Sequence, residues 1–157
     1  MLFRSALGTD APCADGSLCR VTRCSDAGAC EEVTPRPAPP SLACEASFSG
    51  QTVQSRNDVS SYNGSCGTSM TGGENVWLLS PPTGTSTVTL TLSGVVGTGN
   101  LSVLVLTDHC TPSSCVAASG AGGVVTATVP PGGGVLYVVI DGAAGARGRY
   151  SLAVACG

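Results

Sequence analysis

The sequence predicts an all-β protein, an antiparallel β-sandwich of jelly-roll type preceded by a small disulfide-stapled module. Two observations predict the sandwich. Short stretches of alternating apolar and polar residues recur along the chain between glycine and proline clusters, and no window of ten or more residues has a helical pattern of apolar residues. A third observation predicts the disulfide bonds, because the chain has nine cysteines but only one histidine and no lysine.

The cysteines indicate an oxidising, extracellular setting. None of them has the C-x-x-C, haem-attachment or Cys/His spacing that predicts a zinc, haem or redox site. We therefore expect disulfide bonds that supplement a hydrophobic core, with no metal and no cofactor.

Charge and hydropathy exclude two classes of partner. The net charge is -3, and the seven cations are all arginines scattered along the chain, so the clustered basic face of a nucleic-acid binder is absent. The longest apolar run, residues 135–140, is far shorter than the roughly 20 residues of a membrane-spanning helix. Residues 1–8 also lack the apolar core and cleavage site of a signal peptide, so either an export signal has been removed or the chain is a piece of a longer protein, which is the preferred interpretation.

Composition divides the chain into three regions. Residues 34–43 contain paired and alternating prolines, which favour an extended linker. Residues 1–33 form a cysteine-rich module with little apolar material, so two bridges would have to order it. We expect its cysteines to pair among themselves and residues 44–157 to form the sandwich; these cysteines are Cys13, Cys19, Cys24 and Cys30.

Period-two alternation locates the strands of the sandwich. In residues 86–93, three apolar side chains share one face and threonines line the other, as in a half-buried antiparallel strand. Turn-forming residues at 81–84, 97–100, 130–134 and 141–142 separate the segments. The other predicted strands are residues 75–79, 101–106, 115–119, 124–129, 135–140 and 149–156. The predicted core contains Val88, Leu90, Leu92, Val103, Val105, Tyr137, Val139, Leu152 and Val154.

Five cysteines fall in the sandwich. We expect Cys110 and Cys115 to form a local bridge across a turn that contains Pro112. Cys44 could pair with Cys156, because the ends of a domain often lie close together. Pairing of Cys44 with Cys66 is preferred, because it would tie down the long stretch before residue 73. Cys156 is then the candidate for a free or interchain thiol.

No set of residues predicts catalysis. His109 lies between Asp108 and Cys110, but consecutive residues on extended backbone point to alternate faces, so the three cannot form a relay. Glu31 and Glu32 are adjacent and diverge, unlike a glycosidase pair. We expect Trp77 to be a core or half-core residue rather than part of a sugar-stacking platform with Tyr62, Tyr137 and Tyr150. The Asn63 and Asn100 glycosylation sequons are expected to stay unmodified.

Four segments resemble the bacterial pre-peptidase C-terminal domain, in the cysteine-bearing version found in large secreted proteins of myxobacteria. They are the GENVW of residues 73–77, the NLSVLVL of 100–106, the GVLYVVIDG of 134–142 and the GRYSLAV of 148–154. The resemblance covers residues 44–156 and implies a non-catalytic β-sandwich. Members of that family often carry two aspartates where this chain has Asn100 and Ser102, so the resemblance does not imply a calcium site there.

The first 33 residues resemble another extracellular element. The run CADGSLCRVTRC from Cys13 to Cys24, followed by Cys30, is similar to the cysteine repeats with a DGxxCTxDxC core in bacterial and slime-mould matrix proteins. Arg20 and Arg23 replace the usual threonine and aspartate. This resemblance implies a modular surface or matrix protein.

Together these features predict a non-catalytic extracellular module that mediates binding, spacing or delivery for a secreted or cell-surface protein. The alternative is a structural subunit of an extracellular matrix or fibre, assembled through strand edges or an interchain disulfide. The expected partners are a protein or polysaccharide of the matrix, or neighbouring copies of the chain.

Overall fold

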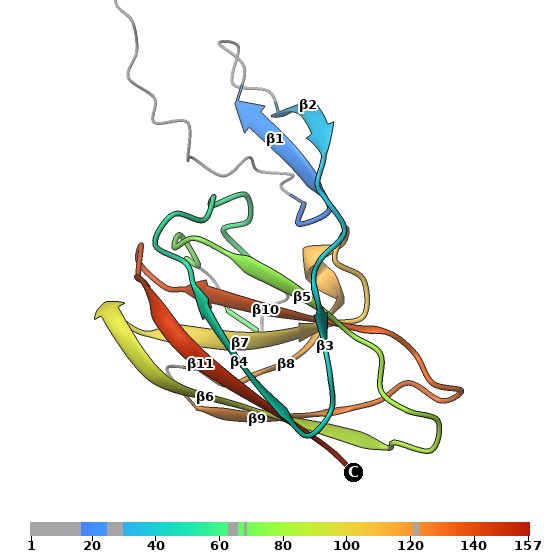
Figure 1. Ribbon diagram of the computed structural model, residues 1–157. Helices are drawn as coiled ribbons and strands as arrows, with labels where there is room; N and C mark the ends of the chain where they lie inside the picture. Colours follow the sequence, from blue (N-terminus) through green and yellow to red (C-terminus); the bar gives the residue numbers. More distant parts are fainter. Residues whose placement is uncertain (1–16, 25–29, 63–65, 68, 121–122) are drawn as a thin grey trace, which may run out of the picture.

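A computed structural model describes residues 17–24, 30–62, 66–67, 69–120 and 123–157, with backbone alone for 20–24 and 30–35. Its strands form a small hairpin and two facing sheets (Figure 1). The only helical element in the described part of the chain is a single 3-10 turn, so no helix there could cross a membrane. The elements are β1 (Arg20–Cys24), β2 (Cys30–Pro35), β3 (Ser41–Leu42), β4 (Ala46–Gln51), β5 (Asn75–Leu79), β6 (Thr87–Thr98), β7 (Leu101–Leu106), η1 (Pro112–Ser114), β8 (Cys115–Ala118), β9 (Val124–Thr128), β10 (Leu136–Gly142) and β11 (Arg147–Cys156).

The sandwich has jelly-roll topology, which confirms the predicted fold class. One sheet has the order β4-β11-β6-β9, and the other has the order β5-β10-β7-β8 with the two-residue β3 added in parallel at the β5 edge. All other pairings are antiparallel. The chain crosses between the sheets after almost every strand, which is the double Greek key of a jelly roll.

The main core lies between the two sheets. The three apolar residues predicted to share one face of β6 are buried there, and they meet Leu152 and Val154 of β11. Threonines occupy the other face of β6, as the alternation predicted. Here the predicted core is confirmed for Val88, Leu90, Leu92, Val103, Val105, Leu152 and Val154.

A second core covers the outer face of the β5-β10-β7-β8 sheet. All six residues of β7 are buried, so both faces of this strand are covered. The described residues between 52 and 74 contribute Val59, Tyr62, Cys66 and Met70 to this cluster, and Leu18 from the N-terminal segment packs against it. Val139 and Tyr137 belong here rather than to the main core, because the alternate residues Val138 and Ile140 of β10 point inward.

The predicted turn at residues 141–142 is wrong. Asp141 and Gly142 continue β10, and the turn follows at residues 143–146, where the Ala146 N–H donates to the Ala143 carbonyl. Gly142 lies in a tight crossing of chains, because its carbonyl accepts the Gly72 N–H at 2.8 Å. A methyl group at Gly142 would collide with the carbonyl oxygen of Ala146.

We predict that Gly142→Ala destabilises the fold by about 2–3 kcal/mol, because the colliding atoms belong to the backbone and the strands must shift to make room. Gly123→Ala is the matched control, since a methyl group there makes only ordinary contacts with Ser119. Urea denaturation of both variants measures the difference. Equal midpoints for the two variants would contradict the close crossing at Gly142.

Candidate functional site

Three buried acidic residues gather on the outer face of the β5-β10-β7-β8 sheet, together with two arginines that pair with one of them. They come from three separate parts of the chain, namely the proline-rich linker, the 52–74 segment and the strands themselves. We call this group the buried charge cluster; its members are Arg36, Arg56, Asp58, Glu74 and Asp141, with Tyr62 hydrogen-bonded to it.

Asp58 anchors the linker to the sandwich. Its side chain is 2% exposed, and it forms ion pairs with Arg36 of the linker and, at 3.3 Å, with Arg56. A buried carboxylate of this kind is strongly destabilising when its partner is removed. The Arg36–Asp58 pair therefore fixes the path of the chain between the N-terminal hairpin and β3.

Glu74 lies directly before β5 and contacts the backbone of Asp58. Its Oε1 accepts the backbone N–H groups of Asp58 at 2.7 Å and Val59 at 2.6 Å, so it holds the 52–74 segment against the sheet. Burial, followed by the nearby charge of Asp141, raises the pKa of Glu74 to about 8. The side chain is therefore largely protonated at neutral pH.

Asp141 joins β10 to the same segment. Its Oδ2 accepts the hydroxyl of Tyr62 at 2.9 Å, and its Oδ1 accepts the N–H of Gly142 at 2.6 Å. Burial raises the pKa of Asp141 to about 6, and burial with the neighbouring Asp141 charge raises the pKa of Tyr62 well above its usual value. The carboxyl groups of the cluster are covered by chain, so the arrangement suits anchoring of the linker and loop rather than contact with a substrate.

A pocket of about 380 Å³ separates the linker from the edge of β5. The linker prolines form one wall, and Val76 and Trp77 of β5 form the other. Beyond the pocket the linker returns to the strand, where the Leu78 N–H donates to the Pro40 carbonyl at 2.8 Å. The pocket is thus a gap in an otherwise continuous junction between the linker and the sheet.

The aromatic residues do not form a sugar-stacking platform. The half-buried Trp77 packs against the main core, where its Nε1 donates to the hydroxyl of Tyr150 at 3.0 Å and its ring lies 5.9 Å from that of Phe48. Tyr150 and Tyr62 are 3% and 5% exposed. The expectation that Trp77 is a half-core residue is confirmed.

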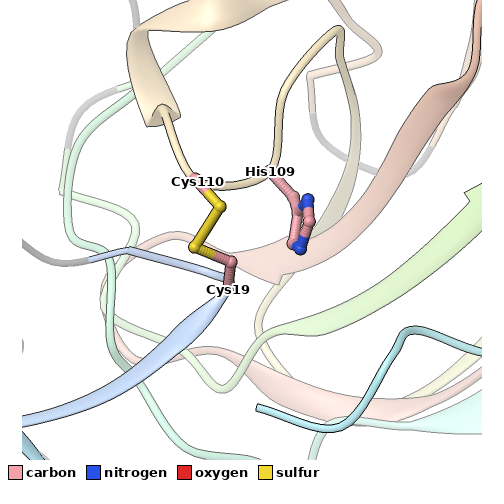
Figure 2. Close-up of side chains that lie close together, drawn as sticks. All are labelled: Cys19, His109 and Cys110. Atoms are coloured by element: carbon pink, nitrogen blue, oxygen red, sulfur yellow. A yellow bond between two sulfur atoms is a disulfide. The ribbon is translucent and has the colours of Figure 1, made fainter. Parts of the chain in front are cut away.

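Cys19 and His109 meet at the junction between the N-terminal segment and the sandwich (Figure 2). Cys19 forms a disulfide with Cys110, 91 residues further along the chain, with a Cα–Cα distance of 4.9 Å. The imidazole of His109 stacks on the ring of Tyr137 at 4.1 Å, and one of its nitrogens lies within 4.8 Å of both sulfur atoms. Two cysteines and a histidine have the composition of a metal site, but metal binding requires thiolates and both sulfurs are used in the disulfide.

Asp108 takes no part in a relay with His109. Its carboxylate accepts the Cys110 N–H at 2.9 Å and the Thr111 hydroxyl at 2.7 Å, and so it shapes the loop before η1. Burial lowers the pKa of His109, which keeps the imidazole neutral at pH 7.

The disulfides differ from both preferred pairings of the sandwich, Cys110 with Cys115 and Cys44 with Cys66, and agree with the alternative of Cys44 with Cys156. Cys110 and Cys115 do not bond to each other, because η1 lies between them and directs Cys110 outward to Cys19 while Cys115 is buried and bonds to Cys66. Cys66 does tie down the 52–74 segment as expected, but to β8 rather than to Cys44. The expectation that the early cysteines pair only among themselves is wrong for Cys19.

Cys156 is not a free thiol, because it forms a disulfide with Cys44 at a Cα–Cα distance of 5.6 Å. The register of β4 and β11 explains the bond. Ala46 pairs with Val154, so continuing the antiparallel ladder by two residues brings Cys44 opposite Cys156. The three bonds use six of the nine cysteines, and the other three are Cys13, Cys24 and Cys30.

Several predicted residues lie outside the described side chains. Cys13 and Asn63 lie outside the described residues altogether. Cys24, Cys30, Glu31 and Glu32 are described through their backbone, in which β1 and β2 pair and Cys24 lies opposite Cys30. The expectations for these side chains stay predictions.

Comparison with known proteins gives one structural likeness. The fold is similar to the pre-peptidase C-terminal domain of the collagenase from Bacillus anthracis, with a TM-score of 0.47 and 12% sequence identity over 77% of this chain and 99% of that chain. No protein-family model matches the sequence, and no curated protein matches it.

Proposed function

We propose that this chain is a non-catalytic extracellular module of a secreted or cell-surface protein, which holds the parts joined to it at a fixed spacing. The observation that carries this proposal is the Cys44–Cys156 disulfide. It joins the start of the first long strand of the sandwich, β4, to the end of the last strand, β11. The chain therefore enters β4 and leaves β11 at the same place, where a disulfide joins the two ends.

Two further features support the same role. The Cys19–Cys110 disulfide and the Arg36–Asp58 ion pair fix the N-terminal segment and the linker to the sandwich. Three disulfides in one chain fit an oxidising compartment outside the cytosol. The sequence resemblance to pre-peptidase C-terminal domains also supports a place in a secreted protein.

A pulling experiment on the full oxidised chain tests the spacing role. Because Cys19 is bonded to Cys110, the N-terminal handle is attached at residue 43, directly before Cys44. Force applied between this handle and the C-terminal end passes through the Cys44–Cys156 bond, and therefore bypasses the hydrogen-bonded strands between these two cysteines. We predict no unfolding extension of the sandwich until a reductant is added. The 112-residue separation then releases about 370–400 Å of chain. A comparable extension in the absence of reductant would contradict the proposal.

The odd number of cysteines favours a second candidate function, that of a subunit joined to neighbouring copies. At most one further bond can form among the three cysteines outside the described disulfides, so one of them has no partner within this chain. Size-exclusion chromatography with and without reductant distinguishes the two functions. A reductant-sensitive dimer supports assembly, and a monomer in both conditions supports the spacing module.

A further inference from the structure

The three disulfides differ in their access to solvent. Cys66 and Cys115 are 5% and 3% exposed, so their bond is sealed within the second core. Cys44 and Cys156 are both half-buried. In the Cys19–Cys110 bond, by contrast, Cys110 is an exposed residue on the loop before η1, and Cys19 is half-buried.

Two polar side chains lie next to this bond, those of His109 and Ser17, and Figure 2 shows His109 beside the disulfide. A nitrogen of the His109 imidazole lies within 4.8 Å of both sulfur atoms, which is close enough for proton transfer after a small movement. On the other side, the hydroxyl of Ser17 lies 3.1 Å from Cys19 Sγ. The same hydroxyl lies 3.2 Å from the Cys110 carbonyl oxygen, to which it donates, and its single proton can turn to Cys19 Sγ when that sulfur becomes a thiolate.

We propose that the Cys19–Cys110 disulfide is a site of thiol–disulfide exchange, at which a thiol from solution attacks the Cys110 sulfur and Cys19 leaves. The direction follows from access and from the leaving group. Cys110 is the more exposed residue of the two, and a departing Cys19 thiolate would be stabilised by the Ser17 hydroxyl.

The step is balanced in atoms, electrons and protons. Neutral His109 takes the proton from the incoming thiol, and the resulting thiolate forms a bond to Cys110 Sγ. The Cys19–Cys110 bond breaks with its electron pair on Cys19 Sγ, and protonated His109 returns the proton to it. The products are a mixed disulfide on Cys110 and a free thiol on Cys19, with no net oxidation or reduction.

Exchange would loosen the N-terminal segment without detaching it at once. The Leu18 side chain is 1% exposed in the second core, and its N–H donates to the His109 carbonyl at 3.2 Å. The Arg36 N–H also donates to the Cys19 carbonyl at 3.1 Å. These contacts hold Cys19 near Cys110, so removal of the incoming thiol would allow the original bond to form again.

Reaction of the full oxidised chain with reduced glutathione, quenched by an alkylating reagent and mapped by mass spectrometry, tests the proposal. We expect glutathione on Cys110 and the alkyl group on Cys19, both appearing at least about tenfold faster than modification of Cys66 or Cys115. Earlier modification of Cys44–Cys156 or Cys66–Cys115, or equal rates at all three bonds, would overturn it.

Two variants test the roles of the neighbouring side chains. His109→Gln should slow exchange at Cys110 by about tenfold near neutral pH, while the rate at Cys44–Cys156 stays unchanged. The charged and titratable groups around His109 are Asp108, Arg36 and the stacked Tyr137. On acidification the rate ratio between the parent and this variant should fall toward one, because protonated imidazole cannot accept the thiol proton. A constant ratio would exclude the proton-transfer role.

Ser17→Ala should slow departure of Cys19 and move part of the glutathione to Cys19, because the two sulfurs become more alike as leaving groups. This variant keeps His109 in place and supplies the test if His109→Gln does not fold. An unchanged rate with all glutathione on Cys110 would show that the hydroxyl does not stabilise the leaving thiolate, and would overturn the role given to Ser17. Glutathione mainly on Cys19 in the parent chain would overturn the proposed direction of attack.

Discussion

Replacing Cys44 and Cys156 together by serine is expected to lower the free energy of unfolding by about 4–5 kcal/mol. The bond closes a loop of 112 residues, and the loss of chain entropy on closing a loop of about this length is worth roughly that amount. Because a domain of this size is stabilised by only about 5–15 kcal/mol, the variant would approach the limit of folding.

Chemical denaturation under non-reducing conditions measures this effect. The single variant Cys44→Ser is the control for connectivity, because it should expose one new reactive thiol, at Cys156, in the folded protein. A double variant as stable as the parent would contradict the closure of the sandwich by this bond. If Cys44→Ser frees the thiol of Cys66 instead, Cys44 is bonded to Cys66, as the sequence first predicted.

Glu74→Gln is expected to remove most of the loss of stability that the parent shows as the pH rises from about 4.5 to 8. The pKa of Glu74 is about 8 in the folded chain and near 4.5 when the chain is unfolded, so the folded state binds more protons in this range. Stability is then full below the lower value and declines as the pH approaches the higher one. The decline is on the order of a few kcal/mol.

The measurement is the unfolding free energy of both proteins between pH 4 and about 9. Glutamine keeps an oxygen that can accept the Asp58 and Val59 N–H groups, so the variant should fold and be the more stable protein at high pH. Glu45→Gln, which changes an exposed side chain, is the control. Parallel pH profiles for the parent and Glu74→Gln would contradict the burial of a protonated carboxyl group. Asp141, whose pKa is raised to about 6, adds a similar decline at lower pH.

The sequence predicted most strands because their side chains alternate strictly. Val88, Leu90 and Leu92 face the core from β6 while threonines face solvent, and this pattern needs no knowledge of the rest of the fold. β4 was not predicted, because Ala46–Gln51 contains one large apolar residue, Phe48, among small and polar ones. Its place in the sheet depends on pairing with β11, more than 90 residues away in the chain.

The missing strand explains the main error in the disulfides. Without β4 beside β11, only the closeness of domain ends favours pairing of Cys44 with Cys156, and the need to hold the long stretch before residue 73 favours Cys66 instead. Cys110 and Cys115 are likewise close in sequence, but a 3-10 turn separates their directions. Sequence spacing indicates which cysteines are near in the chain, whereas the sheet register decides which are near in space.

The buried charge cluster could not be predicted, because its members are isolated charges in the sequence. Asp141 follows an apolar strand and was interpreted as a turn residue, although it continues β10 opposite Ser102. Arg36 lies in a proline-rich stretch, whose composition predicts a linker exposed to solvent. One feature of the sequence could have indicated the position of Asp141. The residue continues the alternation of the strand before it, so its side chain is expected on one face of that strand rather than in a turn.

The Cys19–Cys110 disulfide joins the N-terminal segment covalently to the jelly roll. Proteolytic digestion of the full oxidised chain without reductant, followed by mass spectrometry of the linked peptides, tests this connection. We predict that Cys19 is recovered with Cys110, Cys44 with Cys156, and Cys66 with Cys115. Recovery of Cys110 bonded to Cys115, with Cys19 bonded to Cys13, Cys24 or Cys30, would contradict this connection.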